Sequence, residues 1–378
     1  MRAAVLTVVA VLSAATAAAT ANEKRPWAVV TGASSGIGRA IALEAALRGF
    51  SVVVAARRKR ALSSLVVEIR ACGVQAMPVV VDLASTAGPA KLHRATARLG
   101  TSIELVVANA GFALAGDVVD ADSRSIEQLA AVNMASVALL CRFYGANLAA
   151  SGKGAILLTS SLTALAPLPR AALYGASRAF VHNLADGLAT ELAPRNVRVR
   201  CLLPGATDTG FAFTSGIETS LAFTGPLFRP LGIVTTAAQV ATAALDSVDE
   251  RPWAALRQPS WAANCDVYVS FLQHAYAFAA RALMPRSLAS AFAADFFGAA
   301  SPLASASALL GSLPVLLPGA LCLVAAMPLT LLQGIQASLL GSVLGWPTPL
   351  LALLLVLVLA VFLYYVLFNA WLSSMYGR

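Results

Sequence analysis

The sequence predicts an α/β domain with a doubly wound parallel sheet, followed by a C-terminal hydrophobic helical region that lies in a membrane. Between Trp27 and Leu203, short runs rich in β-branched residues alternate with longer helical patterns. Such alternation is typical of parallel strands covered by helices on both faces. Between Asp295 and Arg378 there is no Lys, Arg, Asp or Glu, so we expect lipid to surround this part.

The first half of the domain supplies four of the six predicted strands, and the helical patterns fall between strands. The predicted strands are Trp27–Val30, Ser51–Ala55, Met77–Val81, Glu104–Val107, Ala155–Thr159 and Val197–Leu202. The clearest helical patterns are Gly36–Leu47, Ser125–Leu148 and Leu173–Leu192. We found no internal repeat, so one domain over residues 23–290 accounts for all these elements.

Composition favours a protein that is partly in lipid. The 378 residues are 58% hydrophobic and 12% charged, against about 45–50% and about 25% in soluble proteins. The net charge is +9, but the basic residues are scattered apart from Arg57–Arg60 and do not alternate with aromatic ones. This pattern predicts no nucleic-acid binding and favours a basic surface beside anionic lipid.

The cysteines and histidines give no sign of a metal site. Five cysteines are widely spaced and form no CxxC pair, so neither a disulfide framework nor a metal site is predicted. The three histidines, His93, His182 and His274, lie outside every motif described below, and we expect structural or exposed positions for them.

The two ends of the chain carry the hydrophobic segments. Residues 1–22 combine Arg2, an apolar run and small residues, a pattern that fits either a cleaved signal peptide or an N-terminal anchor. Within the hydrophobic region 291–378, the run Leu350–Phe368 predicts a membrane span over residues 349–369, because about 20 helical residues cover the roughly 30 Å hydrocarbon core. A second apolar stretch, residues 309–332, is interrupted by prolines and fits a kinked span, a re-entrant helix or a surface-lying segment.

A glycine-rich turn follows the first strand and opens a helix. The segment reads Thr-Gly-Ala-Ser-Ser-Gly-Ile-Gly from Thr31 to Gly38. Glycines permit a tight turn, and a helix N-terminus favours the negative pyrophosphate of a dinucleotide. The strand before and the helix after make this a predicted dinucleotide site. Its candidate contacts are Gly32, Ser34, Ser35, Gly36, Ile37 and Gly38.

The end of the second strand indicates which dinucleotide binds. The strand ends at Ala55-Ala56 and is followed by Arg57 and Arg58. An acidic residue there would hold the ribose 2'-hydroxyl of NAD, whereas a neutral residue followed by arginine suits a 2'-phosphate. The sequence therefore favours NADP(H) over NAD, with Arg57 as a contact.

Ser161, Tyr174 and Arg178 carry the predicted chemistry. Tyr174 and Arg178 are four residues apart, so on a helix they share one face, and the cation favours the phenolate form of the tyrosine. A serine nearby could hold a substrate oxygen against that phenol.

These residues resemble the Ser/Tyr/Lys centre of the short-chain dehydrogenase/reductase family, and the GxxxGxG turn is similar to that of the family. The resemblance covers roughly residues 26–290, with Arg178 where the family has Lys and Ala108 where it has a first Asn. It implies a Rossmann-type fold and places further residues in the site. Those residues are Asp82 at the adenine, Asn109 and Gly111 in the Ala-Asn-Ala-Gly stretch, Asn133 in the proton relay, and Pro204, Gly205, Thr207 and Thr209 near the nicotinamide.

The resemblance implies that Tyr174 is the catalytic acid/base and that Ser161 polarises a carbonyl. Arg178 and Tyr174 would also hold the nicotinamide ribose. An arginine can supply charge and hydrogen bonds there, but guanidinium does not release a proton, so the relay towards Asn133 suits a lysine better.

The sequence thus predicts a membrane-anchored NADP(H)-dependent oxidoreductase that reduces a ketone or aldehyde of a lipophilic substrate, such as a 3-oxoacyl, 3-keto sphingoid, steroid or retinoid compound. The alternative is a membrane-tethered NADP(H)-binding protein with weak or no catalysis because of Arg178. Membrane lipid and a second copy of the chain are the expected partners, with no nucleic acid and no metal. The expected location is a membrane, that of the endoplasmic reticulum in a eukaryote, with the side of the catalytic domain left open.

Overall fold

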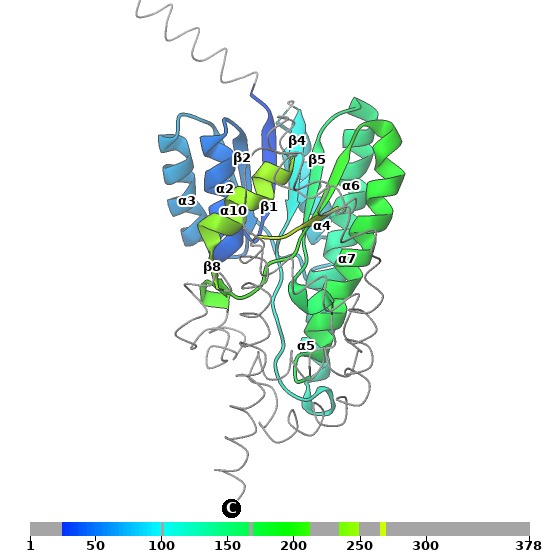
Figure 1. The fold of residues 1–378 in the computed structure, drawn as a ribbon. Helices are drawn as coiled ribbons and strands as arrows, with labels where there is room; N and C mark the ends of the chain where they lie inside the picture. Colours follow the sequence, from blue (N-terminus) through cyan, green and yellow to red (C-terminus); the bar gives the residue numbers. More distant parts are fainter. Residues whose placement is uncertain (1–24, 100–101, 166–168, 212–233, 249–264, 270–378) are drawn as a thin grey trace, which may run out of the picture. The chain divides into compact units, whose positions relative to one another are not determined.

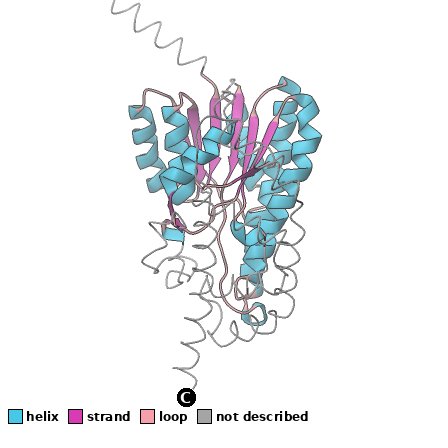
Figure 2. Ribbon diagram, viewed as in Figure 1, coloured by secondary structure: helices cyan, strands magenta, loops and turns pink. Residues whose placement is uncertain are grey.

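The computed structural model describes residues 25–99, 102–165, 169–211, 234–248 and 265–269, all of which belong to the first of two units into which the chain divides, Met1–Met284. These residues build a seven-stranded sheet in the order β3-β2-β1-β4-β5-β6-β9, and every neighbouring pair is parallel (Figures 1 and 2). The strands are β1 (Trp27–Thr31), β2 (Ser51–Ala56), β3 (Ala76–Val80), β4 (Ile103–Ala108), β5 (Ala155–Thr159), β6 (Arg198–Leu202) and β9 (Asp266–Val267). β7 (Thr207–Asp208) and β8 (Thr235–Thr236) form a separate parallel pair.

Helices cover both faces of the sheet, as the alternation of the sequence predicts. The α-helices are α2 (Gly36–Leu47), α3 (Lys59–Ala71), α4 (Gly88–Ala97), α5 (Ser123–Ala130), α6 (Ser136–Ser151), α7 (Ala172–Leu192) and α10 (Ala237–Val248). Short helical turns span Val118–Asp120, Leu162–Ala164 and Ala193–Arg195. One hydrophobic cluster joins the sheet to α2, α3 and α10, and a second joins it to α4, α6 and α7.

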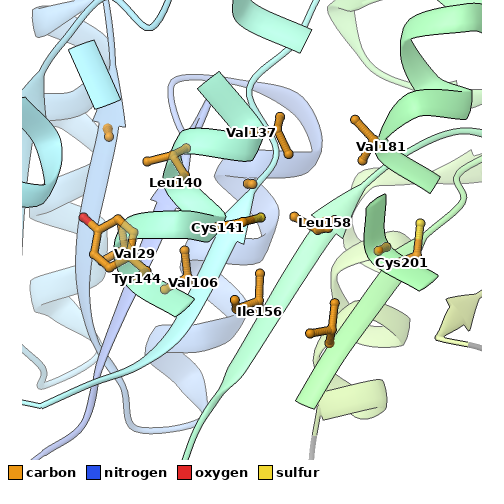
Figure 3. Close-up of a cluster of buried hydrophobic side chains, with 14 of the residues drawn as sticks. Val29, Val106, Val137, Leu140, Cys141, Tyr144, Ile156, Leu158, Val181 and Cys201 are labelled. Atoms are coloured by element: carbon orange, nitrogen blue, oxygen red, sulfur yellow. The ribbon is translucent and has the colours of Figure 1, made fainter. Parts of the chain in front are cut away.

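The cores form because strand residues alternate between the two faces. Val29, Val106 and Ile156 point towards α4, α6 and α7, whereas their neighbours in each strand point to the other cluster. Figure 3 shows Leu140 and Tyr144 packed over β4 and β5 on this face. Tyr144 is 1% exposed, and its hydroxyl shares a hydrogen bond of 2.9 Å with Thr96, while burial raises its pKa to about 12.

The strand order creates the crevice in which this fold binds ligands. β1 pairs with β2 on one side and with β4 on the other, so the connections leave β1 and β4 in opposite directions. In doubly wound sheets, ligands bind outside the carboxyl ends of the strands at this switch point. The glycine-rich turn after β1 and the Asn109–Gly111 stretch after β4 meet there.

The predicted fold class is confirmed, and most predicted strand bounds differ from the observed ones by a residue. The predicted helix Ser125–Leu148 is a longer helical stretch, Ser123–Ser151, in which a π-helical turn at Ala131–Ala135 separates α5 from α6. Lys59 and Arg60 open α3, so these exposed residues lie in a helix. β9 adds a strand beyond the sixth one predicted.

Within the described ranges, Ser123–Ser151 is the one helical stretch long and apolar enough to cross a membrane. Length and composition are weak evidence for a span, and here Leu140 and Tyr144 pack on the sheet as core residues. The predicted spans at 349–369 and 309–332 and the N-terminal segment 1–22 lie outside the described residues, as does the predicted domain boundary at residue 290.

Candidate active site

The glycine-rich turn has the backbone that its sequence predicts. Gly32 and Gly36 adopt φ values of 67° and 56°, a left-handed conformation that favours glycine. Ser35 has extended backbone at the start of α2, and its side chain does not cap the helix. The turn therefore presents the N-terminus of α2, including Ile37 and the buried Gly38, to a ligand.

Thr31 and Asn109 join the ends of three strands beneath this turn. The fully buried Thr31 hydroxyl donates to the carbonyl of Val107 and accepts from the backbone N–H groups of Asn109 and Ala110. The Asn109 amide donates to the Thr31 carbonyl and accepts from the Thr159 hydroxyl at 3.3 Å. Asn109, a predicted cofactor contact, thus uses both ends of its side chain to hold β1, β4 and β5 in register.

Arg58 is the basic side chain against the turn. Its guanidinium donates to the Ser34 hydroxyl at 2.9 Å and to the Ser35 hydroxyl at 2.7 Å. Arg57, the contact named from sequence, is exposed at the end of β2. Arg58 therefore places the positive charge near the turn, in a position where it could meet a 2'-phosphate.

Asp82, the predicted adenine contact, lies in the loop after β3. Its carboxylate accepts a hydrogen bond of 3.0 Å from the backbone N–H of Ala84. The side chain is exposed, and its role at the adenine stays a prediction.

Ser161 and Tyr174 come from adjoining segments after β5. Ser161 precedes a short helical turn, and its hydroxyl accepts from the N–H of Thr163 at 3.2 Å and contacts the Pro204 carbonyl at 3.4 Å. Tyr174 lies in the first turn of α7 and is 9% exposed. Its ring centroid is 5.8 Å from that of Phe211, which gives the phenol an apolar neighbour.

The guanidinium of Arg178 lies beneath Tyr174 and is 4% exposed. Its Cζ is 5.0 Å from the centroid of the Tyr174 ring, and its Nη1 donates to the Thr159 carbonyl at 2.9 Å. A Cβ on Gly111 would overlap Nη2 and would lie 3.0 Å from Cζ. The planar head therefore occupies space that a side chain at position 111 would need.

Arg178 also has an unused donor. Its Nε is buried and has no hydrogen-bond partner among the described residues. A buried cationic donor without an acceptor is costly, so this atom fits a site where a ligand supplies oxygen atoms. The nicotinamide ribose has hydroxyl groups of the required kind, and the residues present therefore fit the cofactor.

Asn133 sits in the π-helical turn and connects three segments. Its fully buried side chain accepts from the N–H of Phe112, donates to the carbonyl of Phe112, and donates to the Ser177 hydroxyl at 3.0 Å. Ser177 in turn donates to the Tyr174 carbonyl at 2.7 Å. π-helical turns of this kind often occur at functional sites, and this one fixes α7 relative to the loop after β4.

The Pro204–Thr209 segment follows β6 and reaches the turn from the opposite side. Thr207 is buried and begins the first strand of the β7–β8 pair, and Gly205 provides a carbonyl that accepts from the Thr207 hydroxyl. A Cβ on Gly36 would lie 3.4 Å from the Cβ of Thr209. The segment predicted at the nicotinamide is therefore adjacent to the segment predicted at the pyrophosphate.

A cavity of about 200 Å³ lies beside the start of α7. Apolar side chains of Leu114, Val118 and Leu173 line it. Three charged residues, Asp117, Asp120 and Arg170, also line it. Because Leu173 precedes Tyr174, the cavity is next to the segment that carries the phenol.

The structure thus brings Tyr174, Arg178 and Asn133 together, and it places Ser161 in the segment before α7 with bonds to Thr163 and Pro204. Reasoning from sequence did not name the supporting roles of Thr31, Thr159 and Ser177 or the contact of Arg58 with the turn, and Arg57 as a cofactor contact stays a prediction. The signal for Arg58 was present in the pair of arginines after β2, whereas hydroxyls that bond to residues 44 or more positions away leave no local pattern.

A model described as short chain dehydrogenase matches residues 26–217. This chain belongs to the short-chain dehydrogenase family. Over 191 residues it is 35% identical to the probable oxidoreductase EphD of Mycobacterium tuberculosis, with 50% of this chain and 32% of that protein aligned. The chain thus spans about a third of that relative's length.

Two further similarities bear on ligands. Over 209 residues the chain is 28% identical to the very-long-chain 3-oxoacyl-CoA reductase of Podospora anserina, covering 54% of this chain and 61% of that protein. A short-chain dehydrogenase from Sphingobium yanoikuyae, solved in complex with NADPH, is 33% identical with a TM-score of 0.53, covering 58% of this chain and 83% of that one. The family consists of oxidoreductases with a nicotinamide cofactor, and the matched residues include the glycine-rich turn, Ser161 and Tyr174.

Proposed function

We propose that this protein is an NADP(H)-dependent oxidoreductase that reduces the carbonyl of a lipophilic substrate, with Tyr174 as the acid/base. The observation that carries the proposal is the position of the Tyr174 ring, whose centroid is 5.0 Å from the guanidinium carbon of the buried Arg178. When bound, the cofactor supplies the hydride for the carbonyl carbon. The chain itself must place the substrate oxygen and provide its proton.

The roles of the residues follow from their surroundings. The Tyr174 phenol donates the proton to the developing alkoxide, and the charge of Arg178 beneath the ring stabilises the phenolate that remains. When substrate binds, the Ser161 hydroxyl turns from the Pro204 carbonyl and donates to the same substrate oxygen. A donor of this kind contributes about 3 kcal/mol in comparable sites. Asn133 positions α7 relative to the loop after β4, because its side chain bonds the backbone of Phe112 and the Ser177 hydroxyl.

Arg58 and the turn support NADP(H) as the cofactor. The guanidinium already bonds two serine hydroxyls of the turn, and a 2'-phosphate could replace those neutral acceptors with a charged one. NAD lacks the 2'-phosphate that this charge would bind, and the residues directly after β2 are Arg57–Arg60 rather than an acidic residue that would hold the ribose of NAD. The solved relative in complex with NADPH agrees with this choice.

The lipophilic substrate is proposed from the apolar side chains around Tyr174. Phe211 packs near the phenol, and Leu114, Val118 and Leu173 line the adjoining cavity. The curated relative named as a very-long-chain 3-oxoacyl-CoA reductase suggests one class of compound to test first. We further propose that the uncharged region 291–378 keeps the enzyme at a membrane, where such substrates dissolve, and that two copies of the chain pair.

The test uses the purified full chain in detergent with NADPH and a panel of 3-oxoacyl thioesters, 3-keto sphingoid bases, steroids and retinoids. Reduced product is detected by mass spectrometry. We expect turnover with at least one class and its loss in Tyr174→Phe, whereas Tyr144→Phe, which alters a core tyrosine, should retain it. Turnover that persists in Tyr174→Phe would overturn the assigned role.

One observation favours a second function. The guanidinium of Arg178 cannot release a proton at accessible pH, and it occupies the position of the family lysine. The alternative is therefore a membrane-tethered NADP(H)-binding protein without useful turnover. If the parent binds NADPH but reduces no carbonyl, and Arg178→Lys gains turnover, this alternative is correct and the enzymatic proposal fails.

The membrane location has its own test. Alkaline extraction distinguishes an integral protein from a peripheral one, and protease digestion of sealed, cytosolic-side-out vesicles reports which side carries residues 23–290. Release of the chain by alkali would contradict the proposed spans. In a eukaryote we propose the endoplasmic reticulum, which organelle fractionation would check.

A further inference from the structure

A second cluster of chemically active side chains lies away from the candidate active site, between α7 and the edge of the sheet. It draws on three elements that are distant in sequence. His182 and Asp186 come from α7, and Cys201 comes from β6. Asp266 begins β9, and Cys265 directly precedes that strand. Figure 3 shows Cys201 at one end of the core, beyond Leu158.

The ligand atoms in this cluster are close together. His182, Cys201 and Asp266 form one set, and Asp186, Cys265 and Asp266 form a second; within each set all the potential ligand atoms lie within 4.8 Å of one another. His182 Nε2 is 2.8 Å from Asp266 Oδ1, and the Cys265 thiol donates to Asp186 Oδ1 at 3.2 Å. Asp266 belongs to both sets and connects them.

Burial makes this combination unusual. Cys201 is fully buried, Cys265 and Asp266 are each 3% exposed, and His182 is 9% exposed. Buried carboxylates are rare unless they are paired or bind a cation. The cluster combines one imidazole, two thiols and two carboxylates, and Asp266 also accepts a hydrogen bond of 3.0 Å from the Tyr268 hydroxyl.

The two thiols are also neighbours, because Cys201 shares a side-chain hydrogen bond with Cys265. Metal coordination deprotonates a thiol, and the thiolates and the carboxylate then offset the charge of a divalent ion.

We propose that this cluster binds one divalent transition-metal ion of the zinc class. The ligands are the imidazole of His182, the thiolates of Cys201 and Cys265, and the carboxylate of Asp266. Sulfur, nitrogen and oxygen ligands in a set of four are the pattern of tetrahedral zinc sites. Binding releases the two thiol protons to solvent, and the side chain of Asp186 then supports the ion from outside the four ligands.

Such an ion would have a structural role. β9 pairs with β6 over only two residue pairs, Cys201 with Asp266 and Leu202 with Val267. Four protein ligands leave no open position for a reaction, as in other structural zinc sites. The ion would therefore fasten the short β9 to both β6 and α7. This proposal is independent of the proposed function, and its tests need no measurement of turnover.

The experiment uses the full chain in detergent without a histidine tag, because a tag would bind metal itself. Metal content is measured by mass spectrometry after gel filtration in zinc-containing and then zinc-free buffer. We expect about one zinc per chain. Replacement by Co²⁺ should give the sulfur-to-metal charge-transfer absorption and visible bands of tetrahedral cobalt thiolates. Substoichiometric zinc together with cobalt spectra that lack these bands would overturn the proposal.

Variants identify the ligands. Cys201→Ser, Cys265→Ser and Asp266→Asn should each lower bound zinc at least about tenfold and weaken the cobalt charge-transfer band. The matched control is Cys141→Ser, another buried cysteine, which lies on α6 outside both sets and should keep full metal content. Stoichiometric metal in a Cys201→Ser/Cys265→Ser double variant would also overturn the assignment.

A thermal measurement covers the case in which a variant does not fold. Zinc added to the chelator-treated parent should raise its Tm by about 5 °C, because an ion that binds only the folded chain stabilises it. The Cys141→Ser control should respond equally. If zinc leaves the Tm of both unchanged, the cluster is a metal-free hydrogen-bond network and the proposal is wrong.

Discussion

Gly111 makes the most specific prediction about how this chain accommodates an arginine beside its catalytic tyrosine. Gly111→Ala adds a methyl group that would overlap Arg178 Nη2 and lie 3.1 Å from Asn133 Oδ1. The guanidinium is buried and bonded to Thr159, so it cannot move aside without losing that bond. Gly111 is not at a positive φ, and the cost of the change therefore comes from contacts rather than from backbone strain.

The magnitude follows from two contributions. Overpacking a buried site costs about 1–3 kcal/mol, and loss of a hydrogen bond to a charged group costs about 1.5–3 kcal/mol. The two contributions do not add fully, because a guanidinium that moves to relieve the overpacking loses its hydrogen bond to Thr159. We therefore expect the free energy of unfolding to fall by about 2–4 kcal/mol. A shift of about 1 Å in the guanidinium should lower kcat/KM about 100-fold.

The assay is a double-mutant cycle with Arg178→Lys, measured by urea unfolding and by NADPH-dependent turnover. A lysine has a slimmer head, so Gly111→Ala should cost less than about 1 kcal/mol in that background, with a coupling energy of about 1–3 kcal/mol. Gly187→Ala is the control, because nothing lies within 4 Å of the added Cβ at this position on α7. It should be neutral or stabilise by up to about 1 kcal/mol. Equal costs of Gly111→Ala in the two backgrounds would refute the steric argument.

Two further predictions concern the turn. Arg58→Ala should raise the KM for NADPH about 10- to 100-fold and leave the KM for NADH unchanged, because it removes charged hydrogen bonds to a phosphate. Arg57→Ala is the control. Equal effects of the two variants in steady-state kinetics would contradict the assignment of Arg58. Thr31→Val should lower the free energy of unfolding by about 2–4 kcal/mol, since two backbone donors lose their acceptor. Thr190→Val, at an exposed site on α7, should change it by less than about 0.5 kcal/mol, and a similar loss in both by urea titration would refute the role of the Thr31 hydroxyl.

The fold could be predicted from the sequence because the patterns that indicate strands, helices and turns are local. Buried parallel strands are runs of β-branched residues in the sequence. Gly32 and Gly36 indicate a tight turn before a helix, because glycine readily adopts the positive φ that this turn has at both positions. Short elements were less predictable. β9 is two residues long, which is too short to show an alternation of apolar and polar residues. The π-helical turn at Asn133 also leaves the helical pattern of the sequence nearly unchanged, because it adds one residue to a single turn.

The supporting contacts of the site depend on long-range pairing. Thr31 reaches residues 76 to 79 positions away, and Arg58 reaches a turn 23 and 24 positions before it. Each is an ordinary polar residue in its own neighbourhood, so only the sheet register reveals its partner. The cluster around Asp266 shows the same limit, because 84 residues separate Asp266 from His182, and cysteine spacing alone predicted no site there.

One face of α7 connects these observations. Tyr174, Arg178, His182 and Asp186 follow each other at intervals of four residues, and such residues line one face of a helix. The first pair forms the proposed acid/base and its cation, and the second pair belongs to the proposed metal site. Between them, the Ser160 hydroxyl donates to the Arg178 carbonyl at 2.8 Å. The helix is therefore held against the sheet at both ends of this face, and the position of the phenol depends on contacts along its length as well as on the arginine beneath it.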